Sequence, residues 1–196
     1  MNSNSIVKPE LNADEWYVEE VPLKTCVEMV IKYHYAKGGS NTATYRHGLF
    51  RRGNSECQGI AWWIPPTKSA AISSYPEGDW KTVLALSRFV LSPDVPKNGA
   101  SFLISKSIKI IKKEKRFECL VTYADLYQNH LGTIYKASNW EYVGMTKPEA
   151  VWVDKSGKMV ARKTGPKTRT KDEMLSLGYI NIGRFSKHKF RLVLKK

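Results

Sequence analysis

The chain has 196 residues, enough for one domain with a hydrophobic core, or for one domain and a small appendage. Its 42% hydrophobic and 26% charged residues are typical of a soluble globular protein, and no apolar run approaches the roughly 18 residues that cross a bilayer. The N-terminus has no apolar secretory segment, and three widely spaced cysteines argue against a disulfide framework or a cysteine zinc site, so we expect a cytoplasmic protein with reduced thiols.

The formal net charge of +14 is concentrated near the C-terminus. Residues 150–196 contain 13 Lys and Arg against three Asp and Glu, a net charge of +10. Aromatic and apolar residues are interleaved with these charges, which indicates a folded surface for a polyanion. A solvated basic tail without a partner is the alternative. A membrane surface is a weaker one, because no amphipathic cationic helix is evident.

The first half of the chain predicts strands around one helix. Pro22 ends the first strand, and Thr25 with Glu28 has the spacing of a capping box at a helix start. The expected elements are a strand at 16–21, a helix at 25–33, strands at 43–50 and 58–64, and a flexible polar insert at 67–79.

The second half predicts alternating strands and helices, followed by a basic extension. Ile104, Ile108 and Ile111 share one helix face, and Asp154–Gly157 has the composition of a hairpin turn. The expected elements are strands at 80–91, 117–123 and from 141, helices at 102–116 and 131–139, a hairpin at 150–161, a basic link at 162–171, a short helix at 171–177 and a strand at 190–194. We therefore predict an α/β (α+β) fold with a mixed central sheet and flanking helices. Residues 1–148 would form its core, and the basic hairpin and extension at 149–196 would complete the same domain.

The link Asp94–Ser101 joins a predicted strand to a predicted helix. Backbone N–H groups at a helix start, with the positive end of the helix dipole, form an anion site. Gly99 would let a phosphate approach, and Lys97 would add charge. In the simpler alternative, Asn98 is an N-cap and Gly99 a turn residue.

The order of elements over Ala85–Gly144 resembles the GNAT acyltransferases, in which two parallel strands separate to admit the pantetheine arm of acyl-CoA. Ile134–Trp140 resembles their second helix, where a Tyr reaches the thioester end of the cleft. The link after the strand lacks the full Q/R-x-x-G-x-G/A pattern of that superfamily. Acetyl-CoA is therefore one candidate donor.

Several short blocks occur in an order that points to a narrower group: His34-Tyr35, His47–Phe50, Trp63–Pro66, Leu86–Phe89, Pro96–Asn98, Ser101–Leu103, Thr122–Asp125, Gly132–Asn139, Gly178-Tyr179 and Lys187–Phe190. They resemble the phage-type Mom family of DNA modification proteins, a divergent GNAT-like group. The resemblance implies conversion of the exocyclic N6 amine of adenine in DNA to a carbamoylmethyl (acetamido) form. Such DNA is protected from restriction in the cytoplasm of an infected or lysogenic bacterial host.

The same resemblance implies site residues. The catalytic set would be His34, Tyr35, Asp125 and Tyr135, and the donor set Arg88, Lys97, Asn98, Gly99 and Ser101. His34 or Asp125 would take a proton from the amine, and Tyr135 would protonate a leaving thiolate. His34, Asp125 and Tyr135 also form an iron-compatible ligand set, and iron chemistry and metal-free acid–base catalysis both stay open. We expect the four catalytic side chains to share one pocket.

The expected partner is double-stranded DNA, and the sequence leaves open whether the chain forms a homodimer. An enzyme that acts on a base inside a duplex must extrude the base and replace its stacking with aromatic contacts. Candidates for such contacts are Trp62, Trp63, Tyr75 and Trp80. The candidate phosphate contacts are Arg162, Lys163, Lys167, Arg169 and Lys171. The rival interpretations are a GNAT enzyme acting on tRNA, protein lysine or a small amine, and a non-enzymatic DNA-binding protein on a degenerate GNAT scaffold.

Overall fold

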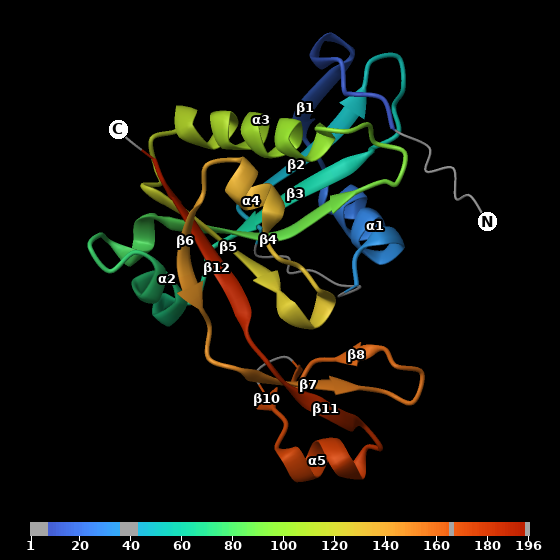
Figure 1. Ribbon diagram of the computed structural model, residues 1–196, viewed down its shortest axis with the longest axis vertical. Coiled ribbons are helices and arrows are strands. Elements are labelled where there is room, and N and C mark those ends of the chain that lie inside the picture. The colour runs from blue at the N-terminus through green and yellow to red at the C-terminus, as the bar shows by residue number, and fades with distance from the viewer. Residues whose placement is uncertain (1–7, 36–42, 165–166, 195–196) are drawn as a thin grey trace, which may run out of the picture.

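The computed structural model describes residues 8–35, 43–164 and 167–194. It confirms the α/β class, because a seven-stranded mixed sheet with flanking helices forms the centre of the molecule (Figure 1). In sheet order the strands are β1 (Trp16–Glu20), β2 (Tyr45–Arg51), β3 (Gly59–Ile64), β4 (Val83–Leu91), β5 (Cys119–Asp125), β12 (Lys187–Val193) and β6 (Glu141–Met145).

Helices cover both faces of this sheet. Helices α3 (Gly99–Lys113) and α4 (Thr133–Ala137) pack on one face, and α1 (Leu23–Tyr33) and α2 (Lys68–Ser74) pack on the other. Because successive side chains of a strand point to opposite faces, Trp62 packs beneath α1 and Trp63 beneath α3. Both indoles are fully buried. The hypothesis that Trp62 or Trp63 stacks on an extruded base is therefore wrong.

Strands β4 and β5 are parallel but pair over only part of their length. Their register runs from Val83 opposite Cys119 to Leu86 opposite Thr122. Beyond that point β4 continues along β3, and β5 continues along β12 as far as Asp125. Ser87 is a β-bulge, because Trp62 and Trp63 pair with the residues on either side of it. The two central strands therefore diverge and leave a wedge between them.

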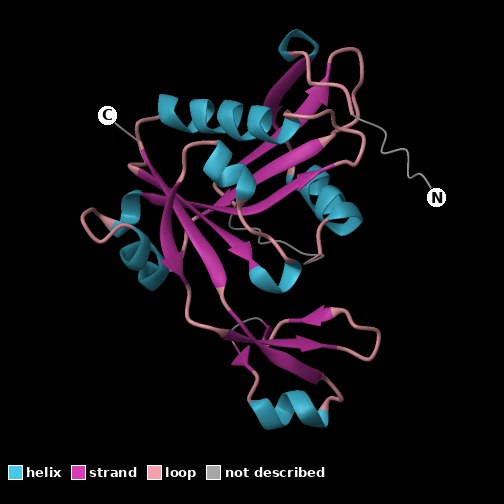
Figure 2. Cartoon of the chain, in the orientation of Figure 1, coloured by secondary structure: helices cyan, strands magenta, loops and turns pink. Residues whose placement is uncertain are grey.

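The C-terminal quarter divides between two sheets. Strands β7 (Glu149–Val153), β8 (Met159–Val160) and β11 (Ile180–Phe185) form a small sheet, which lies below the main body beside α5 (Lys171–Ser176) in Figures 1 and 2. The two-residue strands β9 (Lys163–Thr164) and β10 (Lys167–Thr168) complete this lobe. Strand β12 then returns to the main sheet between β5 and β6. The division of the chain at residue 148 stays a prediction.

Several elements begin or end differently from the sequence expectation. Helix α1 starts at Leu23 with Pro22 as its N-cap, so the capping box expected at Thr25 does not form. The insert expected to be flexible contains α2, which Thr67 caps and whose Ala71 is buried against the sheet. Other differences include an earlier start and end of α3, a 3₁₀ turn in place of the first residues of the strand at 80–91, a shorter α4, and the unexpected strand β11. Strand β5 is shifted by two residues from the expected 117–123, and β12 starts three residues before the expected 190.

The hairpin turn at Asp154–Gly157 forms as expected. The Asp154 carboxylate accepts hydrogen bonds from the backbone N–H groups of Ser156 and Lys158, at 2.9 and 3.0 Å. Gly157 has a φ of +81°, a conformation that favours glycine. This turn sets the register of β7 and β8, with Val153 opposite Met159.

Candidate active site

The wedge between β4 and β5 holds a cavity of about 330 Å³. Three groups of residues line it: the end of α1, the second half of β4, and the segment from β5 to α4. They are Tyr33, His34, Tyr35, Leu86, Ser87, Phe89, Val90, Leu91, Tyr123, Gln128, His130 and Tyr135. The cavity lies where two parallel strands separate, a place where side chains from several elements of an α/β sheet converge.

Tyr35 and Asp125 form the central polar pair of this site. The Tyr35 hydroxyl donates a hydrogen bond to the Asp125 carboxylate, and burial, with the Asp125 charge, raises the pKa of Tyr35 to about 12. Asp125 is 5% exposed at the end of β5. Its carboxylate also accepts the backbone N–H of Tyr127 at 3.0 Å, and the Lys187 ammonium is 3.9 Å away. Asp125 therefore contacts the cavity through the Tyr35 hydroxyl.

Tyr135 reaches the cavity from α4, on the opposite face of the sheet. It is buried, and burial raises the pKa of its phenol, an effect opposed by a hydrogen bond with Thr122. Gly132 places this helix: its φ is +68°, and a Cβ there would lie 2.3 Å from a ring carbon of Phe190. Both Tyr35 and Tyr135 therefore stay protonated near neutral pH, as proton donors.

Two imidazoles, those of His34 and His130, line the cavity beside Tyr35. His34 ends α1 and stacks on Tyr35 with ring centroids 4.3 Å apart. His130 approaches the other side of Tyr35 edge-on, at 5.7 Å, and its backbone N–H donates to the Asp125 carbonyl. The structure thus brings His34, Tyr35 and Tyr135 to one cavity, with Asp125 behind Tyr35. The catalytic roles of these residues stay predictions.

Arg88 and Ser101, expected together on the donor side, lie on different elements and faces. Arg88 is half-buried in β4, donates to the Ser87 carbonyl at 2.8 Å, and lies within electrostatic reach of Tyr35. Burial lowers the pKa of its guanidinium, and Tyr35 opposes that shift. Ser101 lies in the first turn of α3 on the other face. Arg88 is therefore a neighbour of the Tyr35–Asp125 pair.

Backbone groups of the loop before α3 form hydrogen bonds with the N-terminal segment of the chain. The backbone N–H of Lys97 donates to the Pro9 carbonyl, and its carbonyl accepts from Leu11, both at 2.9 Å. Asn98 adopts a left-handed conformation at the N-cap. Gly99 is buried, and a Cβ there would lie 2.2 Å from a Val95 methyl group. Packing against Val95 is thus a sufficient reason for this glycine, and a phosphate role for the loop stays a prediction.

The ligand set suggested for iron does not fit the geometry. Asp125 is engaged with Tyr35, and Tyr135 bonds with Thr122 on the opposite face. In the part of the chain that the structure describes, no three His, Cys, Asp or Glu side chains gather closely enough to hold a metal ion.

The basic residues expected to contact DNA lie in the C-terminal lobe. The Arg162 guanidinium donates to the Arg169 carbonyl at 3.0 and 2.7 Å, and Lys167 pairs with Glu173 at 2.6 Å. Lys163 and Lys171 are exposed. Arg162 and Lys167 are exposed as well, so these contacts fix the positions of basic side chains at the surface of the lobe. Their contact with DNA stays a prediction.

Four polar side chains are among the residues of the site that sequence reasoning missed. His130, Tyr123 and Gln128 line the cavity, and Lys187 lies beside Asp125. Tyr123 and Lys187 belonged to blocks of the family resemblance, which was the one available signal for them. Gln128 ends the 3₁₀ helix Leu126–Gln128 and His130 follows it, in a segment whose course no periodicity reveals.

Comparisons with known proteins identify the family of the chain and confirm its fold. The model of the Mom protein family matches residues 15–195. The chain belongs to the Mom protein family. A search of curated proteins finds no match.

Solved structures with the same fold are GNAT acetyltransferases of low sequence identity. NAA60 of Arabidopsis thaliana, in complex with a bisubstrate analogue, has a TM-score of 0.60 at 10% identity, with 91% of this Mom-family chain and 97% of that chain covered. The ribosomal-protein-S18-alanine N-acetyltransferase of Escherichia coli has a TM-score of 0.52 at 11% identity, covering 92% and 95%. A GNAT acetyltransferase of Elizabethkingia anophelis with acetyl-CoA bound has a TM-score of 0.53 at 9% identity, covering 92% and 99%. The GNAT-like fold is thereby confirmed.

No helix within the described ranges is long and apolar enough to span a membrane.

Proposed function

We propose that this Mom-family protein is a transferase that converts the N6 amine of adenine in DNA to its carbamoylmethyl form. Membership of the family over residues 15–195 is the observation that carries the proposal. The cavity between β4 and β5 supports it, because a proton-accepting pair and protonated phenols surround one space there. In the host cytoplasm, DNA modified in this way would resist restriction.

The donor would lie in the wedge between the two strands. The Elizabethkingia anophelis protein of similar fold has acetyl-CoA bound, which supports a CoA-type donor in this wedge. Attack on a thioester carbonyl would give an N-acyl adenine, so the carbamoylmethyl product requires a donor whose methylene carbon carries the leaving group. Ser87, which the bulge leaves without a partner residue on β3, lines the wedge, and its carbonyl accepts a hydrogen bond from the Arg88 guanidinium. Arg88 would steady negative charge near Tyr35.

The acceptor chemistry follows from the Tyr35–Asp125 pair. The amine nitrogen forms a bond to the methylene carbon of the carbamoylmethyl group, while the bond from that carbon to its leaving group breaks and the electron pair departs with that group. The amine proton passes to the Tyr35 oxygen as the Tyr35 proton passes to Asp125. Tyr135, held protonated by burial, donates a proton to the leaving group. The adenine must leave the base stack to reach this cavity.

The test is a nucleoside digest of DNA from bacteria that express the protein, analysed by mass spectrometry. The proposal expects a deoxyadenosine that carries the added mass of one carbamoylmethyl group. Unmodified DNA together with newly acylated tRNA, protein lysine or a small amine would instead identify a GNAT enzyme with another acceptor. No modification of any of these would favour a binding protein on a GNAT scaffold.

A further inference from the structure

Two open grooves meet the catalytic cavity. The first, of about 860 Å³, runs between the end of α1 and the β7–β8 turn, and it shares Tyr35 and Gln128 with the cavity. The second, of about 670 Å³, runs between α2, the end of β5 and the β6–β7 link, and it shares Tyr123 with the cavity. A small amine or a chain end needs one entrance. An acceptor in the middle of a polymer needs a way in and a way out.

The second groove, here called the lysine groove, carries an excess of positive charge. Lys147, Lys187 and Lys189 line it, and of the described residues along it Glu149 alone bears a carboxylate. Hydroxyl groups complete the lining, from Thr67, Ser69, Ser73, Tyr123 and Thr146. Ammonium and hydroxyl groups are hydrogen-bond donors suited to phosphate oxygens.

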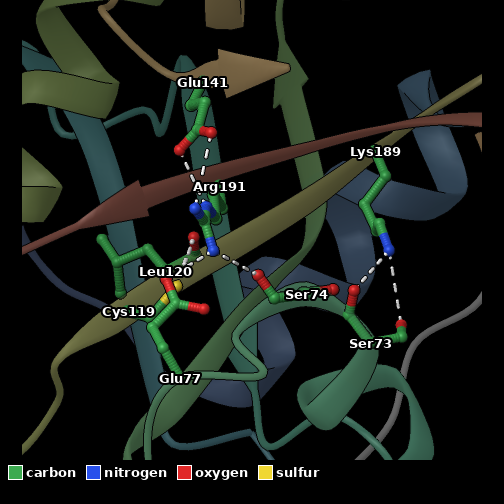
Figure 3. A network of polar contacts seen from close by, with 8 residues as sticks. All are labelled: Ser73, Ser74, Glu77, Cys119, Leu120, Glu141, Lys189 and Arg191. Atoms are coloured by element: carbon green, nitrogen blue, oxygen red, sulfur yellow. Dashed lines mark hydrogen bonds and ion pairs between the residues drawn. The ribbon is translucent and has the colours of Figure 1, made fainter. Parts of the chain in front are cut away.

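The positive charge of Lys189 has no acidic partner among the described residues. Its ammonium donates to the Ser73 carbonyl at 2.7 Å, as Figure 3 shows, and no described carboxylate lies within ion-pair distance. Burial and the neighbouring Arg191 lower the pKa of Lys189. Arg191, two residues along β12, is by contrast neutralised by Glu77 and Glu141, at 2.7 and 2.8 Å. Two carboxylates therefore balance the charge of Arg191, whereas the charge of Lys189 lines the groove without a carboxylate beside it.

We propose that the lysine groove holds phosphate groups on one side of the nucleotide that enters the cavity, and that the groove beneath the β7–β8 turn leads the strand away on the other. This inference rests on the proposed function, and it deepens it by making the acceptor an internal nucleotide of a strand. Lys187 links the two regions, since it lines the lysine groove and lies 3.9 Å from Asp125. The basic lobe at residues 162–171 would then add contacts farther along the strand.

The test measures binding of a labelled single-stranded oligonucleotide with one central adenine, by fluorescence anisotropy over a series of salt concentrations. The variant is Lys147→Gln with Lys189→Gln, which leaves Asp125 and its neighbours unchanged. Each lost phosphate contact lowers the slope of log K against log salt by about 0.7 for a single strand, so the double variant should lose about 1.4. The matched control, Lys109→Gln with Lys113→Gln, removes the same charge from the exposed face of α3 and should keep the wild-type slope.

An unchanged slope in the groove variant, or an equal loss in both double variants, overturns the proposal. Because Lys189 also anchors Ser73, the exposed Lys147→Gln alone serves as a second variant with an expected loss of about 0.7. Binding needs no turnover, so the two proposals can fail separately. A groove variant with a reduced slope supports the groove even if adenine is never modified. If the wild-type protein modifies adenine but the groove variant has the same salt slope as the wild type, the groove proposal is wrong and the proposed function stands.

Discussion

Replacing Tyr35 by Phe removes the hydroxyl that joins the cavity to Asp125 while leaving the aromatic ring against His34. If Tyr35 only positions Asp125, the loss is one hydrogen bond to a charged group, about 1.5–3 kcal/mol, or about 10-fold to 150-fold in rate. If it relays the proton, the loss should reach roughly 10² to 10⁴-fold. We expect the larger value.

Folding should change little in this variant, because Asp125 keeps the Tyr127 N–H and Lys187. A destabilisation of about 1 kcal/mol would lower the melting temperature by about 2–4 °C in a chain of this size. The matched control is Tyr33→Phe, which removes a phenol from the same cavity and should retain most of the activity.

The assay is single-turnover modification of an oligonucleotide, with DNA affinity measured beside it. Affinity should stay near the wild-type value. A rate within tenfold of wild type, or equal losses in the Tyr35 and Tyr33 variants, would refute the assignment of the Tyr35–Asp125 pair.

Three further predictions follow from packing and charge. Gly132→Ala should destabilise the fold by roughly 2–4 kcal/mol in thermal melts, because the residue has a positive φ and its Cβ would strike Phe190; an unchanged melting temperature would contradict this packing. Burial lowers the pKa of His47 to about 4, from about 6.5 when unfolded, so stability should be lost as pH falls from about 6.5 toward 4, by roughly 3 kcal/mol at pH 4. Urea midpoints should show this loss, and His47→Gln should flatten the pH dependence; identical pH profiles would exclude His47 as its source. Lys163→Gln with Lys171→Gln should weaken binding to all duplexes and reduce the salt slope, whereas an unchanged slope would remove the lobe from the DNA-binding surface.

The arrangement of the core could be predicted from the sequence because its signals are local. Apolar spacing at Ile104 and Ile111 marks the buried face of α3, and Asp154–Gly157 marks a turn through its own side-chain chemistry. The order of elements and the family blocks indicated the GNAT-like fold. These signals do not depend on how distant segments meet.

The missed features depend on tertiary contacts. Nothing in the residues around Ser87 signals the bulge, which exists because β3 and β4 pair out of step there. Helix α2 is short and rich in serine, and burial of Ala71 against the sheet stabilises it. Strand β11 has exposed isoleucines at 180 and 182, and pairing with β7 forms the strand.

The sequence indicated which residues form the site, but not how they are arranged in space. Family blocks indicated His34, Tyr35, Asp125 and Tyr135, but not that Asp125 lies behind Tyr35. That arrangement depends on where the chain turns after β5, which the hydrogen bond from His130 to the Asp125 carbonyl helps to fix. The packing role of Gly99 became visible only with Val95 beside it.

The most direct measurement is a comparison of nucleoside digests from bacteria that express the wild-type protein or Asp125→Asn. The asparagine keeps the size of the side chain and removes its capacity to hold the transferred proton. The account predicts carbamoylmethylated deoxyadenosine with the wild type, and a loss of at least roughly 10²-fold with a variant that still folds and binds DNA. Equal amounts of the modified nucleoside from both proteins would contradict it.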